Sequence, residues 1–320
     1  MMNQKISCLT VLMVLVLTLT MLAAVACAGK KNEPTLPGMQ TSQREADVNP
    51  SQTEKNQGAD TGGSSQTSSG EVTSEPPHTN PPAPSGLDGL SNEGIDWWFG
   101  GNYDALNRPA HPLDEQKKYG KYDADFIFSA VEDKIIYLTL DEGYEAGYTG
   151  QILDVLQEKN VQAVFFVTLP YVKDCPDLVK RMIDEGHIVG NHSVNHPSKG
   201  LPSQTLEQQT EEVMGVHRYI LEHFGYEMNL FRYPAGKYSE QSLALLQTLG
   251  YRTVFWSFAY YDYDTAKQPD EAESLERLVN RLHPGAIYLL HAVSATNTNI
   301  LGDFIDRARA EGYTFAPYPA

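Results

Sequence analysis

From residue 134 to the C-terminus, short apolar runs alternate with longer amphipathic stretches. The apolar runs are rich in β-branched and aromatic residues, which is typical of buried strands. They lie at 135–140, 163–168, 188–191, 230–233, 253–259, 286–291 and 314–317. Helical spacing of apolar residues predicts helices at 148–158, 176–185, 205–223, 240–249, 275–282 and 298–310. This alternation predicts an α/β fold with parallel strands joined by helices, either as an open sheet or as a barrel.

The first of these strands ends in two adjacent carboxylates, Asp141 and Glu142, followed by Gly143. Neighbouring side chains of a regular strand point to opposite faces, so both carboxylates can face one cleft only if the strand stops before them. Glycine permits such a break. The carboxyl ends of strands are where α/β enzymes carry catalytic groups. A solvated turn is the alternative, and this stretch alone does not choose between the two.

The N-terminal residues 1–28 have the pattern of an export signal. Lys5 precedes an apolar run at 9–25, which ends in small residues suited to cleavage. A membrane-spanning helix is the alternative, because the run approaches the roughly 20 residues that span a bilayer. The segment before Cys27 resembles a bacterial lipoprotein signal, in which this cysteine becomes the lipidated N-terminus. We therefore expect a protein anchored by lipid at the outer face of the cell membrane, or secreted to the cell wall.

Residues 29–91 are rich in Ser, Thr, Gln, Gly and Pro and poor in large apolar residues. Such a composition buries too little apolar surface to order itself, so we expect a disordered linker. The lead-in at 92–133 includes an expected loop at 102–112. It also carries aromatic residues that we expect to pack on the domain, namely Trp97, Trp98, Phe99 and Tyr103. The catalytic domain is expected at 134–320.

The chain has 41 acidic and 24 basic residues, a net charge of −17. This balance argues against a nucleic-acid partner, which requires a basic face. Of the three cysteines, Cys8 lies in the expected signal and Cys27 at its end, which leaves Cys175 as a structural residue without a disulfide partner. We expect a monomer.

A histidine pair follows the strand at 188–191. His192 and His196 are four residues apart and can share one metal, for which imidazole is a suitable ligand. The spacing alone is weak support for a metal site. However, the pair lies at the same predicted end of the sheet as Asp141 and Glu142. Two histidines and one carboxylate leave one position of a tetrahedral zinc open, as in a catalytic site.

Three further strand ends carry candidate residues. Arg232 is a fixed cation that can orient a carboxylate, although a surface arginine before a turn is the simpler interpretation. Asp262 can support a neighbouring group or be an ordinary loop residue. His291 ends a buried strand and is suited to proton transfer near neutral pH.

In their order along the chain, these pieces resemble the five motifs of the polysaccharide deacetylase (NodB-homology) family. The pieces are Thr139-Leu140-Asp141-Glu142-Gly143, His192 with His196, Arg232 with Pro234 and Gly236, Trp256 with Asp262, and Leu289-Leu290-His291. The resemblance extends from about Lys134 to the C-terminus. Within the family, residues 141–145 and 283–291 are most similar to the delta-lactam-biosynthetic N-acetylmuramic acid deacetylases of spore-forming bacteria.

The resemblance implies a deformed (β/α) barrel that hydrolyses N-acetyl groups of a cell-wall glycan, with N-acetylmuramic acid or N-acetylglucosamine of peptidoglycan as the substrate. It implies that Asp141 is the general base and that Arg232 orients it. It implies that Glu142, His192 and His196 hold a divalent metal, zinc or cobalt. It also implies that His291 is the general acid and that Asp262 holds its imidazole. Such a metal polarises the amide carbonyl, and the acid protonates the leaving nitrogen.

Two departures from the family pattern bear on the site. Glu142 stands where aspartate is usual, so this carboxylate is one methylene longer, and Tyr263 stands where tryptophan is common. Two other functions stay open. A glycosidase using Asp141 and Glu142 is disfavoured because adjacent residues do not flank a glycosidic bond at the required separation. A non-catalytic wall-binding lipoprotein is the other. Tyrosines that could stack on sugars, or simply pack, are Tyr144, Tyr148, Tyr260, Tyr261 and Tyr263.

Overall fold

The computed structural model describes residues 86–130 and 132–319. The expected export signal at 1–28, the anchor at Cys27 and nearly all of the linker at 29–91 lie outside the described residues, so these remain predictions. Within the described part of the chain, no helix has both the length and the apolar character that crossing a membrane requires.

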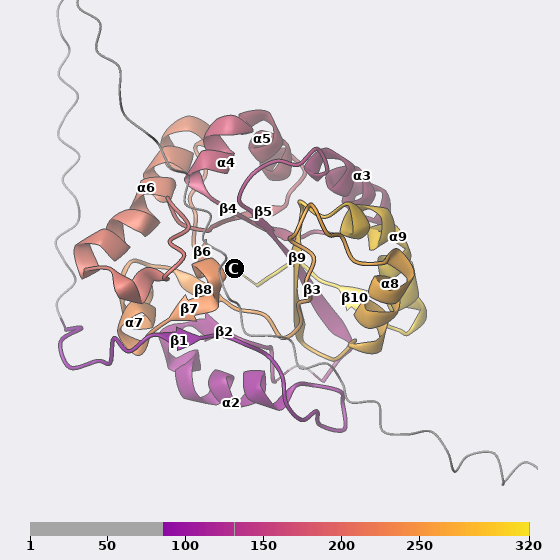
Figure 1. Cartoon of the computed structure of the whole chain (residues 1–320), viewed down its shortest axis with the longest axis horizontal. Coiled ribbons are helices and arrows are strands. Elements are labelled where there is room, and N and C mark those ends of the chain that lie inside the picture. Colours follow the sequence, from indigo (N-terminus) through magenta and orange to yellow (C-terminus); the bar gives the residue numbers. More distant parts are fainter. Residues whose placement is uncertain (1–85, 131, 320) are drawn as a thin grey trace, which may run out of the picture. The chain divides into compact units, whose positions relative to one another are not determined.

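A parallel sheet curves around the centre of the domain (Figure 1). Its strands are β2 (Ala124–Asp125), β3 (Ile135–Glu142), β4 (Val164–Val167), β5 (Ile188–Asn191), β6 (Leu230–Phe231), β8 (Arg252–Val254), β9 (Ala286–His291) and β10 (Thr314–Phe315). The order is β10-β3-β4-β5-β6-β8-β2, and β9 also pairs with β3. A single β-bridge between Phe258, just after β8, and Tyr288 on β9 partly closes the sheet between these two strands. The predicted α/β fold and deformed barrel are confirmed.

Helices cover the outside of the curved sheet (Figure 1). They are α2 (Ala110–Tyr119), α3 (Thr149–Lys159), α4 (Leu169–Asp174), α5 (Pro176–Asp184), α6 (Leu206–Phe224), α7 (Glu240–Thr248), α8 (Glu271–Asn280) and α9 (Ala295–Ala310). Local sequence fixes their ends. In α6, for example, Thr205 and Gln208 form a capping box, and Gly225 ends the helix in the left-handed conformation.

Alternate residues of β3 belong to two separate apolar cores. Leu138 and Leu140 pack with the covering helices, whereas Tyr137 packs with Phe166 and Ile287 on the inner face of the sheet. At the amino end of β3, Tyr318 joins this inner core, and its hydroxyl donates to Asp125 Oδ2 at 2.6 Å. The amino ends of the strands are therefore filled, and the carboxyl ends are left to form a site.

The structure differs from the sequence-based expectations at several places. The strand predicted to stop at 140 continues through Glu142, which has consequences for the site. Most of the loop predicted at 102–112 precedes α2, but the helix begins inside it at Ala110, and β2 of the lead-in joins the sheet beside β8. Trp97 and Phe99 are buried as expected, while Trp98 is 51% exposed. Leu87 packs on α7, so packed residues begin before the expected boundary at 92. A two-stranded antiparallel sheet pairs β1 (Ile95–Asp96) with β7 (Lys237–Tyr238).

Candidate active site

Asp141 is held at the carboxyl end of β3 by a completely buried arginine. Arg232 Nη1 donates to Asp141 Oδ1 at 2.8 Å. The same guanidinium donates to the carbonyls of Val254 at 3.0 Å and Phe255 at 3.2 Å, and it lies 4.2 Å from the centroid of the Phe166 ring. These contacts leave Arg232 a single orientation. Burial alone would raise the pKa of Asp141, but the charges around it, chiefly that of Arg232, hold this pKa below its ordinary value.

The neighbouring carboxylate points away from Asp141. Because β3 continues through Glu142, the two side chains lie on opposite faces of the strand. Glu142 is completely buried and accepts from Thr149 Oγ1 on α3 at 3.4 Å. Its Oε2 atom is buried without a hydrogen-bond partner among the described residues. Burial, and secondarily the charge of Glu145, raises the pKa of Glu142 well above its ordinary value.

The expected ligand set of Glu142, His192 and His196 is therefore not brought together. In the described part of the chain, no three His, Cys, Asp or Glu side chains are grouped as a metal would require. The physical reason is the period of two along a strand. The expected ligand set required the strand to stop after residue 140, and it continues through Glu142.

The two histidines lie beside Asp141. His192 Nδ1 is 2.9 Å from the carbonyl oxygen of Arg232, which only accepts, so Nδ1 carries the proton and Nε2 keeps a lone pair. That Nε2 atom is 3.5 Å from Asp141 Oδ2. Burial lowers the pKa of His192 to about 4, so the ring is neutral at physiological pH. The centroids of the His192 and His196 rings are 4.8 Å apart.

A strained turn places His196. Both Ser193, at φ 74°, and His196, at φ 47°, adopt the left-handed conformation that non-glycine residues rarely use. Glu212 on α6 holds this turn, accepting from the backbone N–H of Asn195 and from its Nδ2, each at 2.8 Å. Glu212 was not predictable as a site residue, because nothing in the sequence distinguishes it from the other acidic residues of this helix.

The two histidines have donor chemistry that suits a metal ion. His192 Nε2 and the Asp141 carboxylate are both acceptors, yet they face each other with no proton between them. A divalent cation would relieve this arrangement. The neutral imidazole of His192, whose Nδ1 donates to a backbone carbonyl, has the environment of a typical metal ligand. The residues present therefore fit a metal held by His192 and His196, without Glu142.

His291 lies across from Asp141 on the neighbouring strand, because the two residues are register partners in the β3–β9 pairing. Asp262 is completely buried, and its Oδ1 is 2.7 Å from His291 Nδ1, while its Oδ2 accepts from the backbone N–H of His291 at 2.9 Å. Burial opposes a charge on His291, but the carboxylates, first of all that of Asp262, raise its pKa above the ordinary value.

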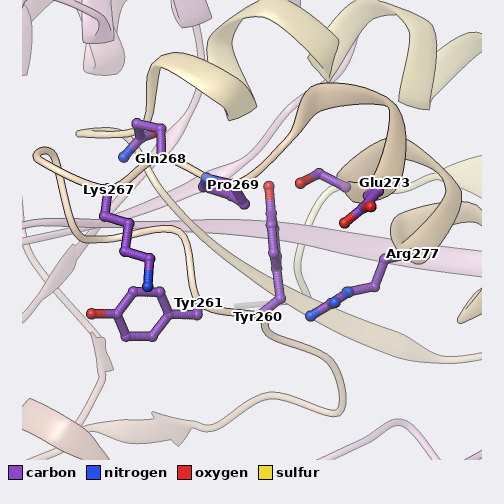
Figure 2. Close-up of a pocket in the computed structure, with 8 residues that line it drawn as sticks. Tyr260, Tyr261, Lys267, Gln268, Pro269, Glu273 and Arg277 are labelled. Atoms are coloured by element: carbon purple, nitrogen blue, oxygen red, sulfur yellow. The ribbon is translucent and has the colours of Figure 1, made fainter. Parts of the chain in front are cut away.

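Of the five candidate sugar-stacking tyrosines, three are exposed: Tyr144, Tyr261 and Tyr263. The Tyr263 ring is 5.3 Å from the His291 ring by centroids and 4.5 Å from Tyr261. Tyr260 is buried, and Figure 2 shows its ring as one wall of a hollow beside α8. Tyr263 therefore presents an aromatic surface next to His291, and the neighbouring Tyr261 extends it.

Comparisons with known proteins agree with this geometry. A family model described as polysaccharide deacetylase matches residues 129–254. The peptidoglycan-N-acetylmuramic acid deacetylase PdaA of Bacillus subtilis is 42% identical over 231 residues, which are 71% of this chain and 85% of that protein. Its structure, a family 4 carbohydrate esterase, has a TM-score of 0.67 over 96% of its own chain and 71% of this one, at 41% identity. A chitooligosaccharide deacetylase of Rhizobium leguminosarum bv. trifolii is 36% identical over 50% of this chain and 72% of its own length.

Proposed function

The chain belongs to the polysaccharide deacetylase family, and from this premise we propose that it removes N-acetyl groups from the sugars of peptidoglycan. It is then a hydrolase of carbon–nitrogen bonds in linear amides. One observation carries the proposal. Asp141, fixed by Arg232, and His291, fixed by Asp262, lie on adjacent strands, beside the imidazoles of His192 and His196.

The reaction needs a base for water and an acid for the leaving amine. Asp141 accepts a proton from the water whose oxygen forms a bond to the acetyl carbon, and Arg232 keeps Asp141 ionised for this task. His291, whose pKa is raised, donates a proton to the nitrogen as the carbon–nitrogen bond breaks. The products are acetate and a free amino sugar. His192 and His196 would hold a divalent metal, which would supply Lewis-acid polarisation of the acetyl carbonyl.

The metal and the sugar are the finer parts of the proposal. Members of the family typically depend on a metal, and two imidazole donors support zinc, with cobalt as a close substitute. N-acetylmuramic acid is the favoured sugar because the relative at 42% identity bears that name, and N-acetylglucosamine is the alternative. Peptidoglycan lies outside the cytoplasm, so the enzyme acts there. A lipid anchor at Cys27 and a monomeric state remain predictions.

Acetate release from purified peptidoglycan, with zinc or cobalt added, tests the proposal. Mass spectrometry of the digested glycan then identifies which sugar has lost its acetyl group. Asp141→Asn should abolish release, while Asp303→Asn, at an exposed carboxylate on α9, should not. New reducing ends without acetate would indicate a glycosidase instead. No metal-dependent acetate from any wall glycan or chito-oligosaccharide would overturn the proposal.

A further inference from the structure

A buried amide on α9 contacts the carboxylate that holds His291. Asn297 is the third residue of α9 and is 2% exposed. Its Nδ2 donates to Asp262 Oδ2 at 2.6 Å and to the carbonyl oxygen of His291 at 3.2 Å. The amide therefore connects the helix to both members of the Asp262–His291 pair.

The hydrogen bonds of Asp262 show why this contact matters. Its Oδ1 is bonded to the imidazole of His291, and its Oδ2 accepts from the backbone of the same residue. Among the described residues, Asn297 is the one side-chain donor to this carboxylate from outside His291. Without it, the Oδ2 atom would keep only the backbone N–H of His291, and the carboxylate would be held less firmly. Asn297 thus helps to fix the orientation of the Asp262 carboxylate from outside His291.

The amide is itself fixed in one orientation. The Tyr260 hydroxyl donates to Asn297 Oδ1, so the amide nitrogen must face Asp262. Gln268 connects the same two segments a second time, donating to the carbonyl of Asp262 at 3.3 Å and accepting from Ser294 Oγ at 2.7 Å. Figure 2 shows Tyr260 and Gln268 on the rim of the same hollow. The loop that bears Asp262 is therefore clamped to the start of α9.

We propose that Asn297 is a positioning residue for the general acid, acting through Asp262. The inference rests on the proposed function, because it concerns how that site holds His291. A firmly held carboxylate keeps the imidazole aimed at the leaving nitrogen, which affects proton transfer and not sugar binding. Loss of Asn297 should therefore lower kcat and leave KM unchanged.

A double-mutant cycle tests this pathway. Asn297→Ala should lower kcat about 10-fold or more, since hydrogen bonds to charged groups are among the stronger ones. In an Asp262→Ala background the same change should cost less than about 2-fold, because the group through which Asn297 acts is gone. Asn297→Asp, which keeps the shape and replaces the donor, should lose at least as much activity as Asn297→Ala. Asn299→Ala is the matched control, an asparagine on the same helix that donates to the exposed Glu271 at 2.6 Å.

A proton NMR measurement separates failure of this inference from failure of the proposed function. The Nδ1 proton of His291 is hydrogen-bonded to the Asp262 carboxylate, so its chemical shift should be strongly downfield in the wild type and in Asn299→Ala. In Asn297→Ala this resonance should shift or be lost to exchange with solvent. This holds whatever the substrate. Absence of acetate release by the wild type, with the shift observed, would overturn only the proposed function. An unchanged Nδ1 resonance, an equal kcat loss in both backgrounds, or a loss that merely follows the fraction of unfolded protein would overturn the inference.

Discussion

Replacing Arg232 with methionine would leave the Asp141 carboxylate buried without its cation. The side chains of this pair are 0% and 9% exposed, and their nearest atoms are 2.8 Å apart. At about 4 Å between charge centres and an effective dielectric constant of about 20, their attraction is about 4 kcal/mol. Breaking one side of a buried pair costs a similar amount, about 3–5 kcal/mol. The carbonyls of Val254 and Phe255 would lose their donors as well.

Thermal and urea unfolding followed by circular dichroism measure this loss. In a domain of this size, about 1 kcal/mol shifts the melting temperature by about 2–4 °C, so Arg232→Met should lower it by about 6–20 °C. The double variant Asp141→Asn/Arg232→Met should recover part of the loss, because neither charge is then left alone.

An exposed ion pair provides the matched control. Arg307 and Glu276 are 2.6 Å apart, but their side chains are 41% and 57% exposed. Such surface pairs contribute at most about 1 kcal/mol, so Arg307→Met should change the melting temperature little. If Arg232→Met costs no more than Arg307→Met, the argument that burial makes the Asp141 pair strong is refuted. The same holds if the double variant is less stable than Arg232→Met.

Three further predictions concern the site. Asp262→Asn removes the carboxylate that raises the pKa of His291. The His291 imidazolium should then lose its proton at lower pH, so the alkaline limb of the kcat–pH profile should move to lower pH. An unmoved alkaline limb would contradict this prediction. A chelator should abolish acetate release, and added zinc or cobalt should restore it. Alanine at His192 or His196 should reduce the metal content of the protein, measured by mass spectrometry. Full metal occupancy in both variants would exclude the two histidines as ligands. Glu142→Gln should leave kcat and metal content nearly unchanged and raise the melting temperature at alkaline pH. Because the pKa of Glu142 is raised in the folded state, folding stability falls as pH rises from the pKa of the unfolded chain toward that of the folded protein, and glutamine removes this dependence. A loss of metal in the Glu142→Gln variant would instead restore Glu142 as a ligand.

The strand ends of the barrel were predictable because parallel strands bring their carboxyl ends to one edge. Asp141, Arg232 and His291 each follow an apolar run, and the structure brings them together. The lead-in was harder to predict. The strand β2 has two residues, too short for a periodic signal, and it is defined by its pairing with β8.

Residues that hold the site from helices were not predictable. Asn297 and Glu212 resemble the other polar residues of α9 and α6, and only tertiary packing makes them buried. The one local signal at Asn297 is its position three residues after the helix cap at Ser294, where its backbone N–H donates to the serine hydroxyl. That pattern locates a helix start and does not indicate a partner in an active site.

Glu142 cannot reach the histidines because its side chain leaves the opposite face of β3, and its extra methylene does not alter this. Its backbone belongs to the β3–β4 ladder, where it is the register partner of Val167, and its carbonyl accepts from the N–H of Thr168 at 3.1 Å. Turning the carboxylate toward His192 would require the strand to unwind at this point and to give up that pairing. An added methylene does not change which face of a strand a side chain leaves from. We therefore expect His192 and His196 to provide most of the affinity for a metal, while Glu142 is a longer, buried acid with a raised pKa that packs on α3.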